Sequence, residues 1–487
     1  MTRALVIGSG PNGLSAAITL LQHGVEVEVR EAAGHLGGGL HTEELTLPGY
    51  LHDICATVQP LAAGSPFFRS LDLGVEWVHP GAPAAHPLDD GTAVMLERGI
   101  AETADALGRD GLPYRRLVEP LVEAWDELAP VLLGRLPPPP RRTLRAARAA
   151  GLGPLATGAR AALGDARSVA ESLFETERAR AWFAGHCAHA MLPLERRPSA
   201  GFGLGLAVLG HAVGWPFARG GSSRLADGLS AHVRELGGSL ATDSSVDELP
   251  QDRLVLADVV PRELVRLARG RLPDRYERRL RSFRHGPGAF KVDWALDGPI
   301  PWSAPECGRA GTVHLGGTLD EISQSEWAAW SGRPAVRPFV LLVQQTVFDG
   351  TRAPAGKHSA WAYCHVPNGS TFDMTERIEA QVERFAPGFS EIVLARHTIG
   401  PAEFEARNRN LVGGDLNGGA MDLGQLLFRP VRRLVPYRTP LEGVYLCSSS
   451  TPPGGGVHGM CGYWAAQAAL HLKAATSSSR RPRSSSP

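Results

Sequence analysis

A glycine-rich loop near the N-terminus most strongly limits what this chain can fold into. The apolar run Ala4–Ile7 leads into the segment GSGPNG, Gly8–Gly13, and a helical run, Leu14–His23, follows directly. Val25–Val29 then alternates apolar and charged residues and leads to Glu31. A strand, a glycine turn, a helix and a second strand in this order predict a βαβ unit at the start of the chain.

Each glycine of this loop has a physical role in holding a dinucleotide. Gly8 permits the tight turn, Gly10 leaves the backbone open to a pyrophosphate, and Gly13 lets the helix pack on the strand. The pyrophosphate then meets free N–H groups at the positive end of the helix. Glu31, 23 residues after Gly8, can accept the ribose hydroxyls and disfavours the 2′-phosphate of NADP. The predicted contacts here are Gly8, Gly10, Pro11, Asn12, Gly13 and Glu31.

A second glycine cluster, Gly37-Gly38-Gly39-Leu40, follows the second predicted strand. An NAD fold does not need it, whereas a chain that closes over a longer, bent cofactor does, because glycine permits positive φ and close backbone approach. This favours FAD, with contacts from Gly38, Gly39 and Leu40. The alternative is a plain flexible loop.

The C-terminal region supplies the second half of the cofactor argument. Between a predicted strand, Gly443–Cys447, and a predicted helix, Tyr463–Ala475, stands the turn PPGGGVHG, residues 452–459. Backbone N–H groups at a helix start can hold the N1/C2=O edge of a flavin and stabilise the negative charge that develops there. The predicted contacts are Gly456, Val457, His458 and Gly459. His458 either donates to the flavin or carries a proton, or it fastens its own loop.

Nucleotide-type elements therefore occur at the start, middle and end of the chain, with helical and β-rich segments between them. We expect an α/β fold: a discontinuous, glutathione-reductase-type (Rossmann-like) FAD-binding domain with an inserted α+β substrate domain. The predicted FAD-binding parts are 1–85, 216–285 and 411–475, the helical and β-rich substrate parts are 86–215 and 286–410, and a disordered tail is 476–487.

These motifs together resemble one known family. GSGPNGLSAA with Glu31, the GGG cluster, Arg219-Gly220-Gly221-Ser222 before a helix, and PPGGGVHGMCGYWAAQAAL are similar to the phytoene dehydrogenase-related FAD oxidoreductases. That group lies within the wider set of carotenoid desaturases and flavin amine oxidases. The resemblance covers nearly the whole chain and is strongest at residues 1–60 and 413–470; residues 413–440 resemble the bacterial subgroup.

The resemblance implies a β-sheet that roofs the flavin and FAD contacts at the positions named above. It adds Val246, whose backbone would hold the adenine. One position departs from the pattern, because many relatives have arginine where this chain has Gly39, which removes a phosphate partner. Relatives dehydrogenate, oxidise or isomerise different molecules, so the fold does not fix the substrate.

The chemistry we expect is hydride transfer from an apolar or amphipathic small molecule to flavin N5. The candidate catalytic residues are His458, Asp415, His52 and Asp53. Each is either a base or substrate contact, or a buried hydrogen-bonding residue. The apolar run Phe202–Val213 lines a substrate channel, touches a membrane surface or, as apolar helices usually do, fills a helix core.

Several classes of function are disfavoured. Lys plus Arg and Asp plus Glu each number 50, so nothing favours a nucleic-acid partner. The six scattered cysteines and the pair His186/His189 have no metal-ligand spacing, which predicts free thiols and core or surface histidines rather than a metal site. We see no signal peptide and no apolar stretch of roughly 20 residues, so we expect a cytoplasmic protein without a membrane span. Peripheral membrane contact and homo-oligomers stay open.

The electron acceptor is also open. Gly203-Leu204-Gly205 follows no strand pattern, so no second dinucleotide loop for a nicotinamide is expected, and oxygen, a quinone or another carrier remains. Two other functions compete with the FAD oxidoreductase. One is a flavin-dependent isomerase with no net redox change, and the other is a non-catalytic FAD-binding protein.

Overall fold

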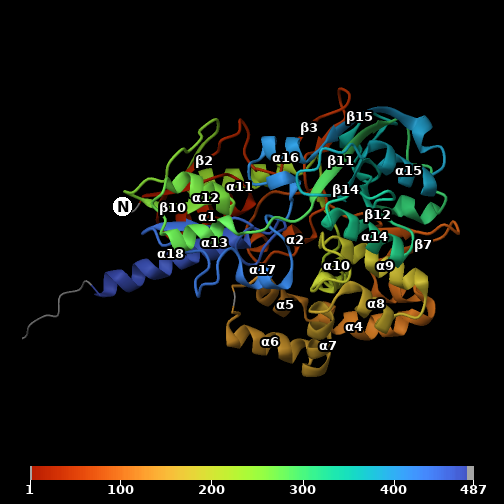
Figure 1. Cartoon of the computed structure of the whole chain (residues 1–487), viewed down its shortest axis with the longest axis horizontal. Coiled ribbons are helices and arrows are strands. Elements are labelled where there is room, and N and C mark those ends of the chain that lie inside the picture. The colour runs from red at the N-terminus through yellow and green to blue at the C-terminus, as the bar shows by residue number, and fades with distance from the viewer. Residues whose placement is uncertain (1–2, 136, 480–487) are drawn as a thin grey trace, which may run out of the picture.

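Two β-sheets organise the chain. The computed structural model describes residues 3–135 and 137–479. Figure 1 shows one sheet toward the N-terminal side of the view and the other at the opposite end of the long axis, with a layer of helices below the second sheet. The fold class predicted from the sequence, an α/β fold with a discontinuous Rossmann-like domain and an inserted α+β domain, is confirmed.

The first sheet has five strands in the order β16-β10-β1-β2-β9, and each pairing is parallel. Its central strands are buried on both faces, which is why they read as apolar runs. The chain reaches this sheet from three distant segments, as the discontinuous prediction requires. The strands are β1 (Arg3–Ile7), β2 (Glu26–Arg30), β9 (Ser239–Ala241), β10 (Leu254–Ala257) and β16 (Val444–Leu446).

Alternate residues of these strands enter two separate cores. Ala4 and Val6 pack with helices α1, α11 and α18, whereas Leu5 and Ile7 pack with α12 and α13. Helices on both faces of a parallel sheet are the arrangement that βαβ crossovers produce. The helices are α1 (Pro11–Gln22), α11 (Ser223–Glu235), α12 (Pro261–Ala268), α13 (Asp274–Arg281) and α18 (Met460–Ser479).

The second sheet has seven strands in the order β15-β11-β14-β13-β12-β6-β7 and is antiparallel except for the pairing of β12 with β6. One face packs on α15 (Thr375–Phe385) through residues such as Ala362 of β14. The other face, which carries Trp361 and Tyr363, looks toward the helical layer. The strands are β6 (Ala82–Pro87), β7 (Ala93–Leu96), β11 (Gly288–Leu296), β12 (Ala310–Leu315), β13 (Val340–Val343), β14 (His358–Val366) and β15 (Val393–Ile399).

The helical layer shares one large core with this sheet. Its central member, α10, is apolar on nearly every side, which is typical of a buried helix. The segment Phe202–Val213 is therefore chiefly helix core. The layer consists of α3 (Ile100–Ala106), α4 (Gly111–Glu123), α5 (Trp125–Leu132), α6 (Pro140–Ala150), α7 (Leu152–Ala162), α8 (Ala166–Leu173), α9 (Glu177–Ala188), α10 (Ser199–Ala212) and α14 (Leu319–Trp330).

Short elements connect these bodies. Two short strand pairs, β3 with β4 and β5 with β8, belong to neither of the large sheets. They and the remaining helices are β3 (Thr42–Glu44), β4 (Leu51–Asp53), β5 (Trp77–Val78), β8 (Phe217–Ala218), α2 (Pro60–Ala63), α16 (Pro401–Arg407) and α17 (Leu423–Phe428). The 3-10 turns are η1 (Phe68–Ser70), η2 (Gly108–Asp110), η3 (Pro305–Arg309), η4 (Gln345–Val347), η5 (Gly350–Arg352), η6 (Phe389–Ile392) and η7 (Val412–Gly414).

Some predicted boundaries differ from the structure. The strand expected over Pro338–Val347 is shorter, because 345–347 turn into η4. The last helix begins three residues before Tyr463, at Met460, and continues to Ser479. Residues 476–479 of the predicted disordered tail are therefore helical, and 480–487 lie outside the described residues. All six cysteines are free, as predicted.

Candidate functional site

The glycine loop after β1 leaves no room for side chains. Gly8 has a φ of +93°, a left-handed conformation that favours glycine. A Cβ on Gly10 would lie 2.8 Å from Oδ2 of Asp258, and a Cβ on Gly13 would lie 2.1 Å from the carbonyl oxygen of Gly8. The first turn of α1 therefore packs directly against the loop, as the spacing of the glycines predicts.

The start of α1 fits a dinucleotide phosphate. Gly10 is the N-cap, Pro11 occupies the first turn, and that turn contains no acidic residue to neutralise the positive end of the helix. Asn12 is buried, and its Oδ1 atom has no hydrogen-bond partner among the described residues. A bare backbone and an unsatisfied buried amide are what a pyrophosphate-binding turn provides.

Asp258, which directly follows β10, lies against this loop and was missed by the sequence reasoning. Its Oδ2 atom accepts a hydrogen bond of 2.9 Å from the backbone N–H of Gly13. Burial raises the pKa of Asp258 to about 7; the Gly13 N–H opposes that shift and the nearby Glu31 carboxylate adds to it. The only signal in the sequence was an acid at the end of an apolar strand, Leu254–Ala257.

Glu31 follows β2 and reaches across to the glycine loop. Its Oε2 atom accepts from the backbone N–H of Ser9 at 2.8 Å and from the Ser9 hydroxyl at 2.7 Å. Its Oε1 atom accepts from the Ala33 N–H at 3.0 Å. The side chain is half-buried, and a carboxylate has further lone pairs, so the predicted contact with a ribose is compatible with these bonds.

The second glycine cluster lies directly on the first. The N–H of Gly37 donates to the carbonyl of Ser9, and a Cβ on Gly38 would lie 3.1 Å from Cα of Gly10. Gly39 lies beside Cys55, and a Cβ on Gly39 would lie 3.5 Å from Sγ of Cys55. Leu40 has its side chain in the core of the first sheet, so only its backbone is available to a ligand.

Val246 comes two residues after Ser244, in the stretch that follows β9. Its side chain is buried in the core formed with α12 and α13. The adjacent stretch is bound to the Glu31 loop, since Ser244 donates from its N–H to the carbonyl of Glu31 at 2.8 Å. Val246 thus offers only backbone to an adenine, as the resemblance implies, and that contact stays a prediction.

The C-terminal turn meets the N-terminal loop, as the sequence predicts for two halves of one site. A Cβ on Gly459 would lie 2.2 Å from the hydroxyl of Ser15 on α1. A Cβ on Gly462 would lie 1.7 Å from the carbonyl oxygen of Asn12. Gly456, with a φ of +112°, lies against Leu61. Helices α1 and α18 therefore cross where the glycines permit backbone contact, and Val457 lies in the same turn, half-buried.

His458 is buried inside this turn with both ring nitrogens engaged. Its Nδ1 atom accepts from the N–H of Met460 at 3.0 Å, and its Nε2 atom lies 3.2 Å from the carbonyl of Gly454. Burial lowers the pKa of His458 to about 4, so the imidazole is neutral near pH 7. These contacts favour the alternative in which the histidine fastens its own loop.

Asp53 is the centre of a buried polar cluster at the end of β4. The Nη2 atom of Arg352 donates to Oδ2 of Asp53 at 2.7 Å, and the hydroxyl of Thr57 donates to the same oxygen at 2.7 Å. The side chains of Arg352 and Asp53 are fully buried. Burial alone would raise the pKa of Asp53, but Arg352 and the hydrogen bonds outweigh it and lower the pKa to about 2. Asp53 is therefore ionised near neutral pH and ties β4 to η5.

His52 points to the opposite side of β4 and meets the second sheet. Its Nδ1 atom lies 3.3 Å from Oδ1 of Asp293, and its Nε2 atom is 2.9 Å from the hydroxyl of Thr46. Both His52 and Asp293 are fully buried. Of the two roles the sequence left open for His52 and Asp53, buried hydrogen bonding agrees with these contacts, and a catalytic role stays a prediction.

Lys291 on β11 is a second residue that the sequence reasoning missed. Its side chain is 2% exposed, its ammonium contacts Asp293, and it lies 5.2 Å from the centre of the Trp361 ring. Burial would raise the pKa of Asp293, but Lys291 and His52 together outweigh it and lower that pKa. A lysine and an aspartate two residues apart in a mostly apolar strand, Ala289–Leu296, were the signal available in the sequence.

Trp361 joins these two clusters. Its indole N–H donates to the hydroxyl of Thr57 at 2.8 Å, and Thr57 donates to Asp53. Strand register places Tyr363 opposite Lys291, on the face of the sheet that looks toward the helical layer. A buried network thus runs from β4 through β14 to β11 along this face.

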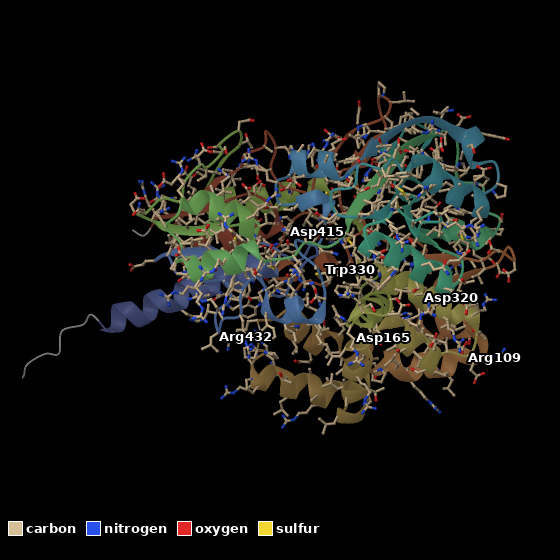
Figure 2. The ribbon with its side chains drawn as sticks, viewed as in Figure 1. Arg109, Asp165, Asp320, Trp330, Asp415 and Arg432 are labelled. Atoms are coloured by element: carbon tan, nitrogen blue, oxygen red, sulfur yellow. The ribbon has the colours of Figure 1, made fainter. Side chains whose placement is uncertain are left out.

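Asp415 is fully buried between two loops. It accepts hydrogen bonds from the N–H of Gly286 at 3.0 Å and the N–H of Asn417 at 2.9 Å, and its Oδ2 atom lies 3.2 Å from Nδ1 of His285. Figure 2 shows Asp415 near the middle of the view, between the two sheets, with Trp330 close to the same region. Its bonds fasten the loop to the start of β11, and a base or substrate role stays a prediction.

His186 and His189 are part of a buried histidine cluster rather than surface residues. His189 Nε2 lies 2.9 Å from Nε2 of His314, and the rings of His186 and His314 are 4.9 Å apart. His86 lies near the same cluster, because Nδ1 of both His86 and His314 would lie 3.1 Å from a Cβ on Gly185. Residues 3–135 and 137–479 hold no group of three or more potential metal ligands.

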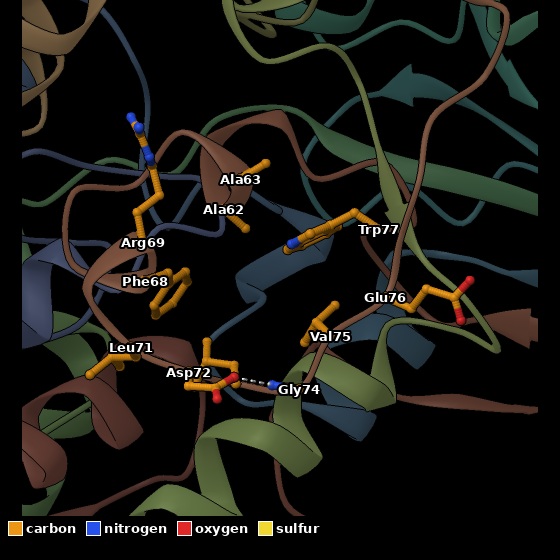
Figure 3. A pocket seen from close by; sticks show the side chains of 11 residues that line it. Ala62, Ala63, Phe68, Arg69, Leu71, Asp72, Gly74, Val75, Glu76 and Trp77 are labelled. Atoms are coloured by element: carbon orange, nitrogen blue, oxygen red, sulfur yellow. Dashed lines mark hydrogen bonds between the residues drawn. The ribbon is translucent and has the colours of Figure 1, made fainter.

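A separate cavity of about 460 Å³ lies beside α2 and β5. Figure 3 shows its lining, with Phe68 and Trp77 on opposite sides and Asp72 bonded to the Gly74 N–H below. The lining includes none of the predicted site residues. Gly203 and Gly205 lie within α10, so the segment that was doubted as a second dinucleotide loop is helix.

Comparisons with known proteins agree with this geometry. The family described as "NAD(P)-binding Rossmann-like domain" matches residues 6–85, which contain both N-terminal glycine segments. The chain is 28% identical over 537 aligned residues to "Pyridine nucleotide-disulfide oxidoreductase domain-containing protein 2" of Rattus norvegicus, covering 94% of this chain and 91% of that protein. It is 30% identical over 139 residues to a component of the limonene dehydrogenase of Castellaniella defragrans, covering 27% of this chain and 25% of that protein.

Solved structures show the same architecture. An oxidoreductase from Methanosarcina mazei superimposes with a TM-score of 0.63 at 16% identity, covering 96% of this chain and all of that one. Putrescine oxidase bound to putrescine gives a TM-score of 0.61 at 14% identity, covering 97% of this chain and 99% of that one. Fold and site therefore define a Rossmann-type dinucleotide-binding protein, and the chain is related to proteins named as oxidoreductases. The narrower assignment to the phytoene dehydrogenase-related enzymes stays a prediction.

Proposed function

We propose that this chain is an FAD-dependent oxidoreductase, a dehydrogenase or oxidase, that transfers a hydride from an apolar or amphipathic small molecule to flavin N5. The observation that carries the proposal is the convergence of three glycine segments, 8–13, 37–39 and 454–459, around the start of α1. An NAD site needs only the first of them, whereas an elongated flavin dinucleotide uses all three.

The residues of the first sheet suit the adenosine and pyrophosphate. Glu31 would bind the ribose, the backbone of Val246 the adenine, and Gly10, Asn12 and Gly38 the phosphates. Gly13, whose N–H donates to Asp258, would contribute by letting the cofactor approach the backbone closely. The C-terminal turn 456–459 would hold the flavin edge through its N–H groups. When bound, FAD supplies a two-electron acceptor at N5, and the protein supplies orientation and electrostatics.

Lys291 is the residue of this chain best suited to act at the reacting end. Cys55 lies beside Gly39, and the charge on Lys291 lowers the pKa of its thiol, although burial dominates and raises that pKa to about 11. Cys55 and Tyr363 also pack against one hydrophobic cluster, and Tyr363 lies opposite Lys291 in the β11–β14 pairing, which puts Lys291 near the predicted path of the cofactor. Asp293 and the Trp361 ring hold the ammonium of Lys291 in one orientation, so it presents a fixed positive charge that attracts negative charge developing on the cofactor.

The surroundings favour a neutral, largely apolar substrate. Partly buried apolar side chains line the junction of the sheet, α2 and α10, and they are Val58, Leu61, Leu206 and Tyr363. The buried carboxylates on this side are already paired: Asp53 with Arg352, Asp293 with Lys291, and Glu326 with His365 at 2.8 Å. No unpaired buried carboxylate in the described part of this face is left for an ammonium group, so we propose an apolar substrate rather than an amine.

The first test is an absorbance spectrum of the purified protein, followed by denaturation and identification of the released cofactor. We expect flavin absorption and FAD in near-equal molar amount to protein. Anaerobic mixing with terpenes, polyenes, alcohols and amines should then bleach the flavin with members of the apolar classes, and air or a quinone should restore it. A folded protein that is colourless and does not bind added FAD would overturn the proposal.

The same assay separates the two competing functions. An isomerase would change its substrate without lasting bleaching of the flavin. A non-catalytic FAD-binding protein would be yellow and show no reduction with any compound, and Lys291→Met would then leave its spectrum and reduction behaviour unchanged.

A further inference from the structure

Residues 128–164 form a stretch without a single acidic residue in a chain whose total charge is zero. The stretch runs from the end of α5 through α6 and α7. It contains six arginines, which are Arg135, Arg141, Arg142, Arg145, Arg148 and Arg160. Neither the proposed cofactor site nor the proposed chemistry uses them. Figure 1 shows α6 and α7 at the lower edge of the molecule.

Helix α6 has one face of small, buried residues and one face of exposed, mostly basic residues. Its inward face consists of the small residues Ala146, Ala147 and Ala150. Its outward face carries Arg141, Leu144, Arg145 and Arg148, at spacings of three and four residues, and Leu144 is 50% exposed. Exposed apolar and basic side chains on one face are what a helix at a membrane interface presents.

Helix α7 continues the same character. Gly158 is its only fully buried residue, and Leu155, Ala161 and Ala162 are partly buried against the core, so the opposite side of the helix is left exposed. Leu152 is 77% exposed and Leu163 is 53% exposed, and Arg160 is exposed between them. Among the described residues, the exposed arginines of α6 and α7 form no ion pair, in contrast to Arg167 just beyond, which contacts Glu171, Glu195 and Asp320.

Exposed apolar side chains also stand at both ends of the segment 427–435, whose middle residues, 429–431, are buried. Leu434 is 93% exposed, and Arg432 and Arg433 precede it. Figure 2 labels Arg432 in the lower left part of the view. Eight of the fourteen exposed large apolar side chains in the described part of the chain belong to these two segments: Leu132, Leu144, Leu152, Leu163, Leu427, Phe428, Leu434 and Val435.

We propose that the outer face of α6 and α7, which we call the α6–α7 surface, docks on a bilayer containing anionic phospholipids. Arginines would bind lipid phosphates, and the exposed leucines would enter the boundary between headgroups and acyl chains. No helix among the described residues is long and apolar enough to cross a membrane, so the contact lies in the plane of the interface. Nucleic acid fits this surface less well, because it would leave the leucines in water.

The test is flotation of the purified, cofactor-loaded full chain with two kinds of vesicle. One contains phosphatidylcholine alone, and the other contains phosphatidylcholine with one-third phosphatidylglycerol. We expect binding to the anionic vesicles that weakens as salt is raised, and little binding to the neutral ones.

Two variants separate charge from apolar insertion. Since each arginine near an anionic surface contributes about 1 kcal/mol, Arg141→Gln/Arg145→Gln/Arg148→Gln should weaken partitioning to anionic vesicles by about a hundredfold at low salt. Leu144→Gln/Leu152→Gln/Leu163→Gln should also weaken it, by at least tenfold. The matched control is Arg275→Gln/Arg278→Gln/Arg279→Gln on α13, three exposed arginines whose loss should leave binding unchanged.

Circular dichroism and the flavin spectrum of each variant will verify that it is folded and loaded. Absence of binding to anionic vesicles by the folded wild type would overturn the proposal. So would equal loss in the α13 control, or binding that is insensitive to the leucine changes and is shared by heparin, which would indicate a general polyanion surface. None of these outcomes depends on the substrate or on catalysis.

Discussion

At the residue scale, the glycine loop of this chain differs from a simple phosphate-binding turn, because one of its backbone N–H groups already donates a hydrogen bond to Asp258. The Asp258 carboxyl accepts from Gly13 and lies within the influence of Glu31, and burial holds its pKa at about 7. An ionised carboxylate at that place repels a pyrophosphate, whereas a protonated one does not.

Replacing Asp258 tests this coupling. FAD affinity of the wild type should fall as the pH rises through about 7, because Asp258 then loses its proton next to the phosphates. Asp258→Asn should bind FAD more tightly than the wild type at pH 8.5 and about equally at pH 5.5. Fluorescence titration of the apoprotein with FAD at the two pH values measures the affinity. Identical pH profiles for the wild type and the variant would contradict the prediction.

Lys291 is the second residue-scale case. Lys291→Met keeps the length of the side chain but removes the charge, and it leaves Asp293 with only His52 beside it. We expect flavin reduction by the substrate to slow by about a hundredfold, in the range for loss of one electrostatic group. Bound FAD should stay near wild-type amounts. Stopped-flow reduction measures the rate, and Lys357→Met, just before β14, is the control because its lysine side chain is 40% exposed.

At the scale of elements, the crossing of α1 and α18 brings the two ends of the chain together. The crossing depends on Gly462, whose missing Cβ would otherwise lie 1.7 Å from the Asn12 carbonyl. Asn12 belongs to the first turn of α1, so any displacement of α18 also displaces the predicted phosphate site.

Gly462→Ala should therefore separate the two helices. We expect a loss of about 1–3 kcal/mol in unfolding free energy, the usual cost of overpacking, and a lower content of bound FAD. Gly205→Ala on α10 is a matched control, since a Cβ there meets nothing within 4 Å. That control should be neutral or slightly stabilising, because alanine favours a helix over glycine. Urea denaturation of both variants measures the change in unfolding free energy.

At the scale of the whole molecule, a buried histidine cluster lies where the helical layer meets the second sheet. Burial lowers the pKa of His86 and His186 to about 4 and that of His189 to about 3, and it lowers the pKa of His314 well below its usual value. In the unfolded chain these residues bind protons below about pH 6.5.

The unfolded state then binds more protons than the folded state between about pH 6.5 and 4. The unfolding free energy should fall in that window as the pH falls, by up to about 1.4 kcal/mol per pH unit for each such histidine. Asp258 acts in the opposite sense, because its raised pKa lets the folded state gain a proton between about pH 7 and 4.

Urea titrations at pH 7.5, 6.0 and 5.0 measure this slope. His186→Phe should reduce the slope of unfolding free energy against pH by the contribution of one histidine. His23→Gln, a change at an exposed helix end, should leave that slope unchanged. A flat profile over this range in the wild type would contradict the prediction.

Local patterns were enough to predict much of the fold and of the cofactor site. Gly8, Gly10 and Gly13 define a βαβ turn by their own spacing, since each acts on backbone within a few residues. The turn 454–459 was recognisable for the same reason. Polar residues were harder: the sequence marks His52 and Asp53 as unusual but cannot say that Asp293 and Arg352, hundreds of residues away, pair with them.

The sequence by itself determined the dinucleotide unit, because strand, turn and helix propensities and the absence of side chains are properties of adjacent residues. Only the tertiary structure decided where the charges act. Asp258 reaches the glycine loop because β10 lies beside β1, and Lys291 lies against Trp361 because β11 pairs with β14. Such contacts depend on how strands far apart in the chain assemble, and burial then sets the pKa of each group, which no local pattern records.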